Sequence, residues 1–130
     1  MSTDELRCWF EDYLDACNRH DLDGIRDRLA PDVRRAGEAG GADAWLQDLA
    51  ALLAAFPDYR WKRITVVVEG DRIAAHLRTR GTHRGPFRGI RPTGRHVGVA
   101  AFAFYRVVGG RISEYAGSDA DAELAAQLER

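Results

Sequence analysis

A change in the spacing of apolar residues at Pro57 divides this 130-residue chain into two parts with different secondary structure. Before Pro57, apolar side chains recur at intervals of three and four positions, which is typical of amphipathic helices. After it, β-branched and apolar residues alternate with polar ones or form short apolar runs, which is typical of strands. Helices followed by antiparallel strands predict an α+β fold with helices packed on one face of a curved sheet.

Three helices are predicted before the change of period. Residues 3–18 form an amphipathic helix with one aromatic face, and Thr3 stands in the position of its cap. Residues 22–29 repeat the same period, and Pro31 ends that shorter helix. A glycine-rich loop follows, after which Asp43 is placed to cap a third helix.

Two hairpins and a last helix are predicted after the change of period. The turn signal EGDR joins a strand at residues 61–68 to a strand at residues 73–80. A long arm rich in Gly, Pro and Arg leads to a second hairpin, whose strands are residues 97–108 and 111–116. Helical spacing returns at residues 119–128. With no internal repeat, the chain is predicted to be a single domain, 1–130.

Charge and composition exclude several functions. Lys and Arg number 19 against 20 Asp and Glu, and a net charge of −1 gives no global field that would attract nucleic acid or an anionic membrane. No apolar stretch approaches the roughly 20 residues that cross a bilayer, so we expect a cytoplasmic protein. Cys8 and Cys17 are predicted to be free thiols. The four histidines lack metal-binding spacings, so neither a metal nor another cofactor is expected.

Several short sequence motifs, separated by fixed numbers of residues, resemble those of one known family. FPDYRW, GTHRG and PTGR, followed by a long apolar strand and GRISEY, are similar to the SnoaL-like polyketide cyclase family of the nuclear-transport-factor-2-like group. The resemblance covers nearly the whole chain and is most specific from Phe56 to Glu114.

The resemblance implies a fold, a ligand and an assembly. It implies a cone-shaped barrel of a curved, mostly antiparallel sheet on three N-terminal helices, with a conical pocket between them. It further implies a homodimer and cofactor-free chemistry on a small polyketide-like substrate in secondary metabolism. Family members commonly carry an aromatic residue two positions after the glutamate of the last strand, followed by a catalytic aspartate. Ala116 stands in place of that aromatic residue, and the aspartate is either Asp119 or Asp121.

An aldol-type ring closure needs a base that removes a proton next to a carbonyl group and an acid that protonates the attacked oxygen. Asp119 is the first candidate for this base and acid, and Asp121 is the second. Helix capping is the competing interpretation of either aspartate. His83, at the end of a predicted strand, is the candidate that assists at a substrate oxygen, and a purely structural hydrogen bond is its alternative.

The cavity that these groups would serve needs apolar walls and charged residues at its opening. Glu114 lies between Ile112 and Ala116, so strict alternation places it on an apolar face, paired with an arginine inside the cone. Arg88 is expected at the mouth, where it could meet an anionic group, whereas Arg78 and Arg80 are expected to face solvent. The candidate wall residues are Trp9, Tyr13, Trp45, Phe87 and Tyr105, and for Trp9, Tyr13 and Trp45 a place in the core is the alternative.

Three functions remain open from the sequence. The first is a cofactor-independent cyclase or isomerase acting on a polyketide-like substrate. The second is an epoxide hydrolase or another acid–base enzyme on the same cone, with Glu114 paired with Asp119 or Asp121. The third is a non-catalytic ligand-binding or accessory protein of a biosynthetic pathway, which the alanine at position 116 favours.

Overall fold

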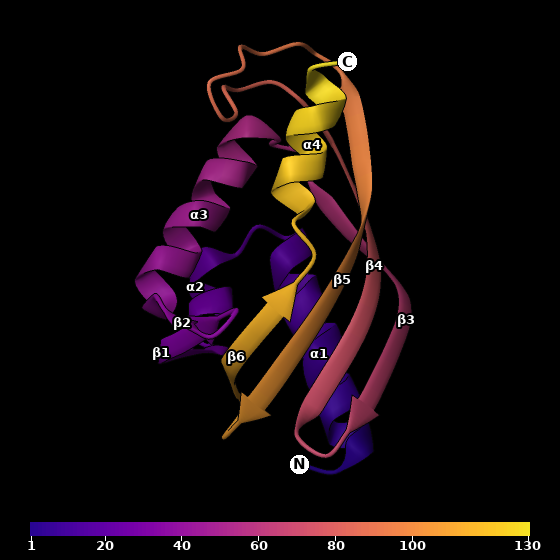
Figure 1. Cartoon of the computed structure of the whole chain (residues 1–130). Coiled ribbons are helices and arrows are strands. Elements are labelled where there is room, and N and C mark those ends of the chain that lie inside the picture. The colour runs from indigo at the N-terminus through magenta and orange to yellow at the C-terminus, as the bar shows by residue number, and fades with distance from the viewer.

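A single six-stranded sheet, in the order β2-β1-β6-β5-β4-β3, organises the chain in the computed structural model, which describes all residues 1–130 (Figure 1). The pairing of β1 with β6 is parallel, and all other pairings are antiparallel. This confirms the mixed α+β class with a curved, mostly antiparallel sheet. The strands are β1 (Leu29–Arg35), β2 (Glu38–Ala39), β3 (Arg60–Glu69), β4 (Arg72–Thr82), β5 (His96–Val108) and β6 (Arg111–Gly117).

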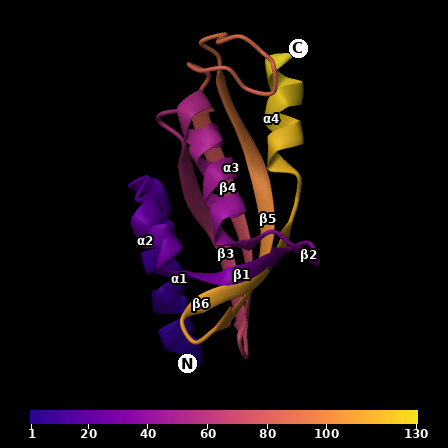
Figure 2. The same cartoon turned by 90° about the vertical axis from the view of Figure 1, so that its left-hand side faces the viewer.

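Helices cover one face of this sheet, as Figure 2 shows for α1 and α2. α3 and α4 lie next to each other toward the end of the sheet at which the chain terminates (Figure 1). No helix is long and apolar enough to span a bilayer. The helices are α1 (Thr3–Asn18), α2 (Leu22–Arg26), α3 (Gly41–Ala55) and α4 (Ala120–Leu128).

The helix caps differ from the predicted ones. The Ser2 hydroxyl accepts a hydrogen bond from the Glu5 backbone N–H at 3.1 Å, and the Glu5 carboxylate accepts one from the Ser2 backbone N–H at 3.0 Å. α1 therefore has a reciprocal capping box that begins one residue before Thr3. Asp43 lies inside the first turn of α3 and pairs with Arg26 at 2.8 Å, so it does not cap that helix.

The second helix is shorter than predicted, and its last apolar residue belongs to a strand. Leu29 begins β1 and pairs with Ile112 of β6, and Val33 is the next fully buried residue of the strand. Pro31 lies where the register between β1 and β6 shifts, before pairing resumes at Arg34. A proline without an N–H is tolerated there because the ladder is already interrupted.

A β-bulge in β6 changes which side chains face the core. Arg106 pairs with Glu114 and Val107 pairs with Ile112, so Ser113 has no partner of its own on β5. Ile112 is fully buried, whereas the side chain of Glu114 is 46% exposed. The prediction that Glu114 shares the apolar face of Ile112 was wrong, because one extra residue reverses the alternation of the strand.

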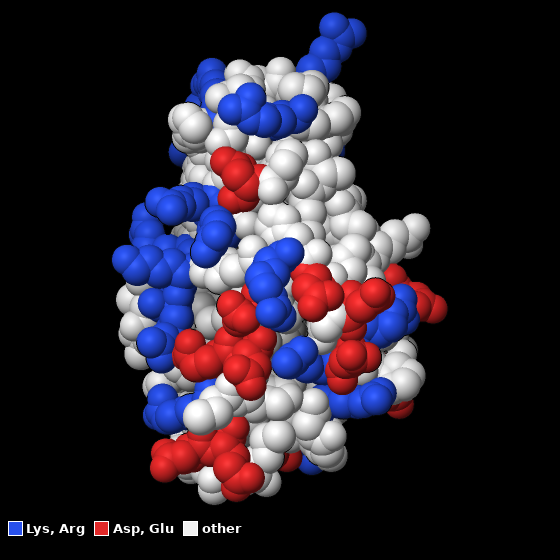
Figure 3. All heavy atoms as spheres, turned by 180° about the vertical axis from the view of Figure 1, so that it is seen from behind, with Lys and Arg blue, Asp and Glu red and all other residues white.

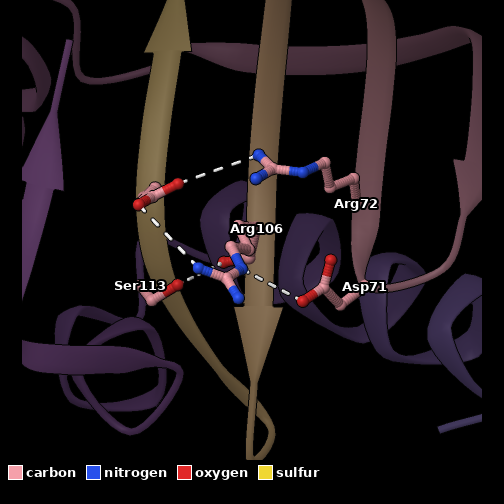
Figure 4. A network of polar contacts seen from close by, with 5 residues as sticks. Asp71, Arg72, Arg106 and Ser113 are labelled. Atoms are coloured by element: carbon pink, nitrogen blue, oxygen red, sulfur yellow. Dashed lines mark hydrogen bonds and ion pairs between the residues drawn. The ribbon is translucent and has the colours of Figure 1, made fainter. Parts of the chain in front are cut away.

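Glu114 instead joins a polar network on the outer face of the sheet (Figure 4). The Arg106 Nε donates to Asp71 at 3.0 Å, and its guanidinium lies 4.0 Å from the Glu114 carboxylate. Arg72 approaches the same carboxylate at 3.7 Å, and the Ser113 hydroxyl donates to the Arg106 carbonyl at 3.3 Å. These groups are solvent-accessible, so Glu114 pairs with arginines outside the fold, where exposed ion pairs contribute little to stability.

α4 is fixed to β5 where β6 has ended. The Gln127 side-chain amide donates to the Gly98 carbonyl at 2.7 Å, and its oxygen accepts from the Gly98 N–H at 3.2 Å. Leu124 and Leu128 are buried on the inner side with Phe56 of α3's C-cap. The start of α4 is thereby held near the centre of the covered face of the sheet.

Charges are unevenly distributed on the back of the molecule (Figure 3). Acidic side chains gather over α1, and basic side chains gather on the β3 side next to a hollow (Figure 3). Arg78 lies directly opposite Lys62, and Arg80 lies directly opposite Arg60. Arg78 and Arg80 are exposed, as predicted.

Candidate active site

A cavity of about 190 Å³ lies between α1, α3 and the covered face of the sheet. Its walls are mostly apolar, and they contain two carboxyl groups and one guanidinium. No cluster of three or more His, Cys, Asp or Glu side chains suited to a metal ion is present in the structure. The lining residues are Tyr13, Leu14, Cys17, Arg35, Trp45, Asp48, Leu49, Leu52, Trp61, Leu77, Tyr105, Tyr115 and Asp121.

Tyrosines form the deep end of this cavity. Tyr13 and Tyr105 are each only 5% exposed, and their ring centres are 5.8 Å apart. Tyr115 follows the bulge in β6, and its ring centre lies 5.3 Å from that of Tyr105. Burial raises the pKa of all three phenols and raises that of the adjacent Cys17 thiol to about 12. These four groups are therefore neutral near pH 7.

Charged groups form the mouth of the cavity. The Arg35 Nη2 lies 2.8 Å from the Asp48 carboxylate, and the guanidinium stands 5.9 Å from the centre of the Trp45 ring. Asp121 is half-buried in the first turn of α4. Burial raises the pKa of Asp121, the charge of Arg88 opposes that shift, and the negative charges of two neighbouring aspartates add to it. Asp121 therefore has the environment of a tunable acid or base.

The structure distinguishes the two candidate aspartates by position. The Asp119 carboxylate accepts a hydrogen bond from the Ala122 backbone N–H at 3.0 Å and so caps α4. Its side chain is 72% exposed and does not line the cavity. Asp121, two residues further along, does line the cavity. The capping interpretation thus applies to Asp119, and Asp121 is the one of the two that lines the cavity.

His83 and Phe87 lie away from this cavity, contrary to prediction. The His83 ring is fully buried, its Nδ1 accepts from the Thr93 N–H at 3.1 Å, and its Nε2 is enclosed without a hydrogen-bond partner. Phe56 packs against both His83 and Phe87, with ring centres 5.5 and 5.2 Å away. Both residues belong to the packing beneath the 83–95 arm, so a ligand in the cavity does not reach them.

Other predicted site residues are divided between the cavity and its surroundings. Tyr13, Trp45 and Tyr105 line the cavity, as predicted. Trp9 stacks on Tyr13 at 5.7 Å and donates its indole N–H to the Gly110 carbonyl at 2.9 Å, so it supports the wall from behind. Arg88 is half-exposed, 4.0 Å from Asp119, close enough to affect the pKa of Asp121.

Sequence reasoning missed much of the cavity lining, including Tyr115, Arg35 and Asp48. The sequence did not predict that Tyr115 faces the cavity, because no pattern in the sequence indicates the bulge that turns it inward. Arg35 and Asp48 come from β1 and α3, and only the tertiary fold brings them together. Ala116 pairs with Phe104 on the outer face of the sheet, so an aromatic residue at this position would not line the cavity. The alanine is therefore no argument against catalysis.

Comparison with known proteins establishes the family. Residues 9–128 match the sequence profile of the SnoaL-like polyketide cyclases, and the chain belongs to that family. No curated protein matches the chain.

Solved structures with the same fold include proteins described by different reactions. AclR, a proposed hydroxylase from Streptomyces galilaeus, is 27% identical, with a TM-score of 0.89 over 98% of this chain and 87% of its own. IdmH, a proposed polyketide cyclase from Streptomyces antibioticus, is 28% identical, with a TM-score of 0.81 over 95% of this chain and 98% of its own. TsrD from Streptomyces laurentii shares the fold at 22% identity, with a TM-score of 0.85 over 98% of this chain and 97% of its own.

Replacing Asp121 by asparagine is expected to stabilise the protein at neutral pH. Because the pKa of Asp121 is raised on folding, the folded state binds its proton more tightly, and stability falls as pH rises from the ordinary value of 3.8 through the raised value. Urea unfolding should show a gain for Asp121→Asn at pH 7 that disappears below the ordinary pKa. Asp119→Asn, which keeps a capping side chain on an exposed position, should show no such pH-dependent gain; equal behaviour of the two variants would contradict the burial of Asp121.

Proposed function

We propose that the protein is a cofactor-independent acid–base enzyme that closes a ring in a polyketide-like substrate by an aldol-type step. The observation that supports this proposal is the half-buried carboxyl of Asp121, with a raised pKa, at the mouth of a mostly apolar cavity. A base works best when its pKa is near the working pH, and partial burial moves an aspartate in that direction. Membership of the SnoaL-like family agrees with a cyclase-type reaction.

In the proposed reaction, the Asp121 carboxylate removes a proton from a carbon next to a substrate carbonyl. The enolate carbon then attacks a second carbonyl carbon of the same molecule, and the new carbon–carbon bond closes the ring. The electron pair of that second carbonyl moves to its oxygen, which takes the proton back from Asp121. One carboxyl group is thus base and then acid, and no atom is gained or lost.

The size of the cavity limits which part of a substrate it can enclose. A dry cavity of about 150 Å³ holds one benzene ring, and this cavity measures about 190 Å³. We therefore expect one ring of the substrate to be enclosed between Trp45 and Tyr105 while the rest extends through the mouth. There it would pass Arg35, which could hold an anionic group of the substrate.

The proposal predicts enzyme-catalysed deuterium uptake from D2O into 1-tetralone, a bicyclic aromatic ketone of suitable size with an enolisable CH2 group. Asp121→Asn should lower the rate by a factor of about 100 or more, which is the usual effect of removing a general base. Asp119→Asn should retain most of the rate, because that side chain caps α4 outside the cavity. Proton NMR measures the exchange. Equal rates in the two variants would remove Asp121 from the mechanism, and binding without exchange would favour the accessory role.

A specific pair of carboxyl groups favours an epoxide hydrolase as a second candidate. The pair predicted from sequence is not formed, because Glu114 lies on the outer face of the sheet. Asp48 takes that place: it is fixed by Arg35 at 2.8 Å, and its charge raises the pKa of Asp121. Two carboxyl groups in such different environments suit a division of labour in which Asp48 activates water and Asp121 protonates the epoxide oxygen.

Isotope labelling separates these two reactions. In water enriched in oxygen-18, hydrolysis of styrene oxide would place one labelled oxygen in the diol, as mass spectrometry would detect. Aldol closure would place none through the ring-forming step. We expect no enzyme-dependent hydrolysis; labelled diol that disappears in Asp48→Asn would reverse the ranking of the two candidates.

We also propose a homodimer formed through the outer face of the sheet, as the family resemblance implies. Phe102 and Phe104 of β5 are 52% and 63% exposed, and Val67 of β3 is 55% exposed. Exposed apolar groups of this size on one sheet face commonly mark an interface between proteins. Phe104→Glu should convert the dimer to a monomer in sedimentation analysis, whereas Ala51→Glu, at an exposed position of α3 away from this face, should leave it intact. A monomeric wild-type protein would contradict this assembly.

A further inference from the structure

Three phenol side chains from three different elements line the cavity together, with Tyr13 and Tyr105 at its deep end and Tyr115 on the side toward Asp121 and Arg35. Tyr13 comes from α1, Tyr105 from β5 and Tyr115 from β6. Tyr105 is the central ring, with Tyr13 and Tyr115 at 5.8 and 5.3 Å. The cross-strand pairing of Tyr105 with Tyr115 and the bulge at Ser113 hold the last two rings on the same face.

The hydroxyl groups of this cluster are free to bind a ligand. The Tyr13 hydroxyl lies beside the Cys17 thiol, which is at most a weak hydrogen-bonding partner. No protein oxygen or nitrogen forms a hydrogen bond with the hydroxyls of Tyr105 and Tyr115. The one fully buried side-chain polar atom without a partner in the structure is the His83 Nε2, so these phenol oxygens are not sealed in the core and must open on the cavity they line.

The surroundings favour an anionic oxygen as the group that these donors bind. The side chains packed around them are Leu14, Leu77 and neutral Cys17, so water competes little for the hydrogen bonds. Hydrogen bonds from neutral donors to an anion are shorter and about twice as strong as those to a neutral acceptor. Fixed donors in such a dry site are the usual way in which enzymes stabilise a developing oxyanion.

We propose that the hydroxyl groups of Tyr13, Tyr105 and Tyr115 form a binding site for one enolate or phenolate oxygen of a planar ring. The inference deepens the proposed function, because it assigns the oxygen of the enolised carbonyl to the deep end and the acidic carbon to the Asp121 side. Asp121 lines the same cavity and lies near enough to Tyr115 for their charges to interact. The substrate class is then a flat, aromatic or polycarbonyl ring that enters with its oxygen first.

Equilibrium binding of 4-nitrophenol tests this site without turnover, because the phenolate of this probe is yellow and the phenol is not. Asp121→Asn is the protein to use, since it lacks the nearby carboxylate that would repel the bound anion. We expect the probe to bind as phenolate at a pH at which it is mostly neutral in solution. Tyr105→Phe in this background should weaken binding about tenfold, the usual effect of one lost hydrogen bond to a charged group. Tyr13→Phe and Tyr115→Phe should act in the same direction.

Tyr59→Phe is the matched control. Tyr59 is also buried, with a pKa raised by burial to about 12, but it does not line the cavity. Its loss should leave probe affinity unchanged, and circular dichroism should show that every variant is folded. The inference would be overturned if the probe did not bind or bound only as neutral phenol. It would also be overturned if Tyr59→Phe and Tyr105→Phe lowered the affinity for the probe equally. If wild-type protein still exchanges 1-tetralone in that case, the proposed function survives without the oxyanion site; if only the exchange fails, the site survives without that reaction.

Discussion

The contact between the aromatic face of α1 and the middle of the sheet determines most of this structure. Phe10 and Tyr13 of α1 pack on Tyr105 of β5, with ring centres 5.2 and 5.8 Å away. Aromatic pairs of this kind contribute about 0.5–1.5 kcal/mol each beyond the burial of their area. Because these rings are rigid and meet at steep angles, they join helix to sheet without filling the space beside them. The cavity is a consequence of that packing.

The two ends of the cavity differ in the kind of polar group that they present. The deep end has neutral donors that burial keeps protonated, whereas the mouth has Arg35, Asp48 and Asp121, which keep contact with water. Such an arrangement suits a ligand that places an oxygen inside and reacts near the opening. AclR and IdmH share this fold but are described by different reactions, so the fold alone does not determine the chemistry.

Sequence patterns predicted the parts of this structure that depend on local periodicity. The aromatic face of α1 and the hairpin strands follow from spacing, whereas the place of Tyr13 in the cavity wall followed from the cone that the family resemblance implies. The β1 strand was missed because Leu29 fits both a helical repeat and the start of a strand. Its pairing with Ile112 of β6, which is distant in the sequence, makes it part of a strand. The choice between Asp119 and Asp121 depends on the orientation of α4, which Gln127 fixes through a distant strand. The prediction for His83 was wrong because a position at the end of a strand does not indicate whether the side chain enters the cavity or the packing beneath the 83–95 arm.

The bulge at Ser113 has a consequence for comparing relatives of this protein. If the same residues of β6 paired without the bulge, Ser113 would lie opposite Arg106 and Glu114 opposite Tyr105, so the glutamate would enter the cavity and the tyrosine would face outward. An alignment that slides through β6 without a gap therefore equates residues on opposite faces of the sheet. In the evolution of this fold, a change of one residue in the register of β6 at this point exchanges a hydrogen-bond donor for an acid in the cavity in a single step.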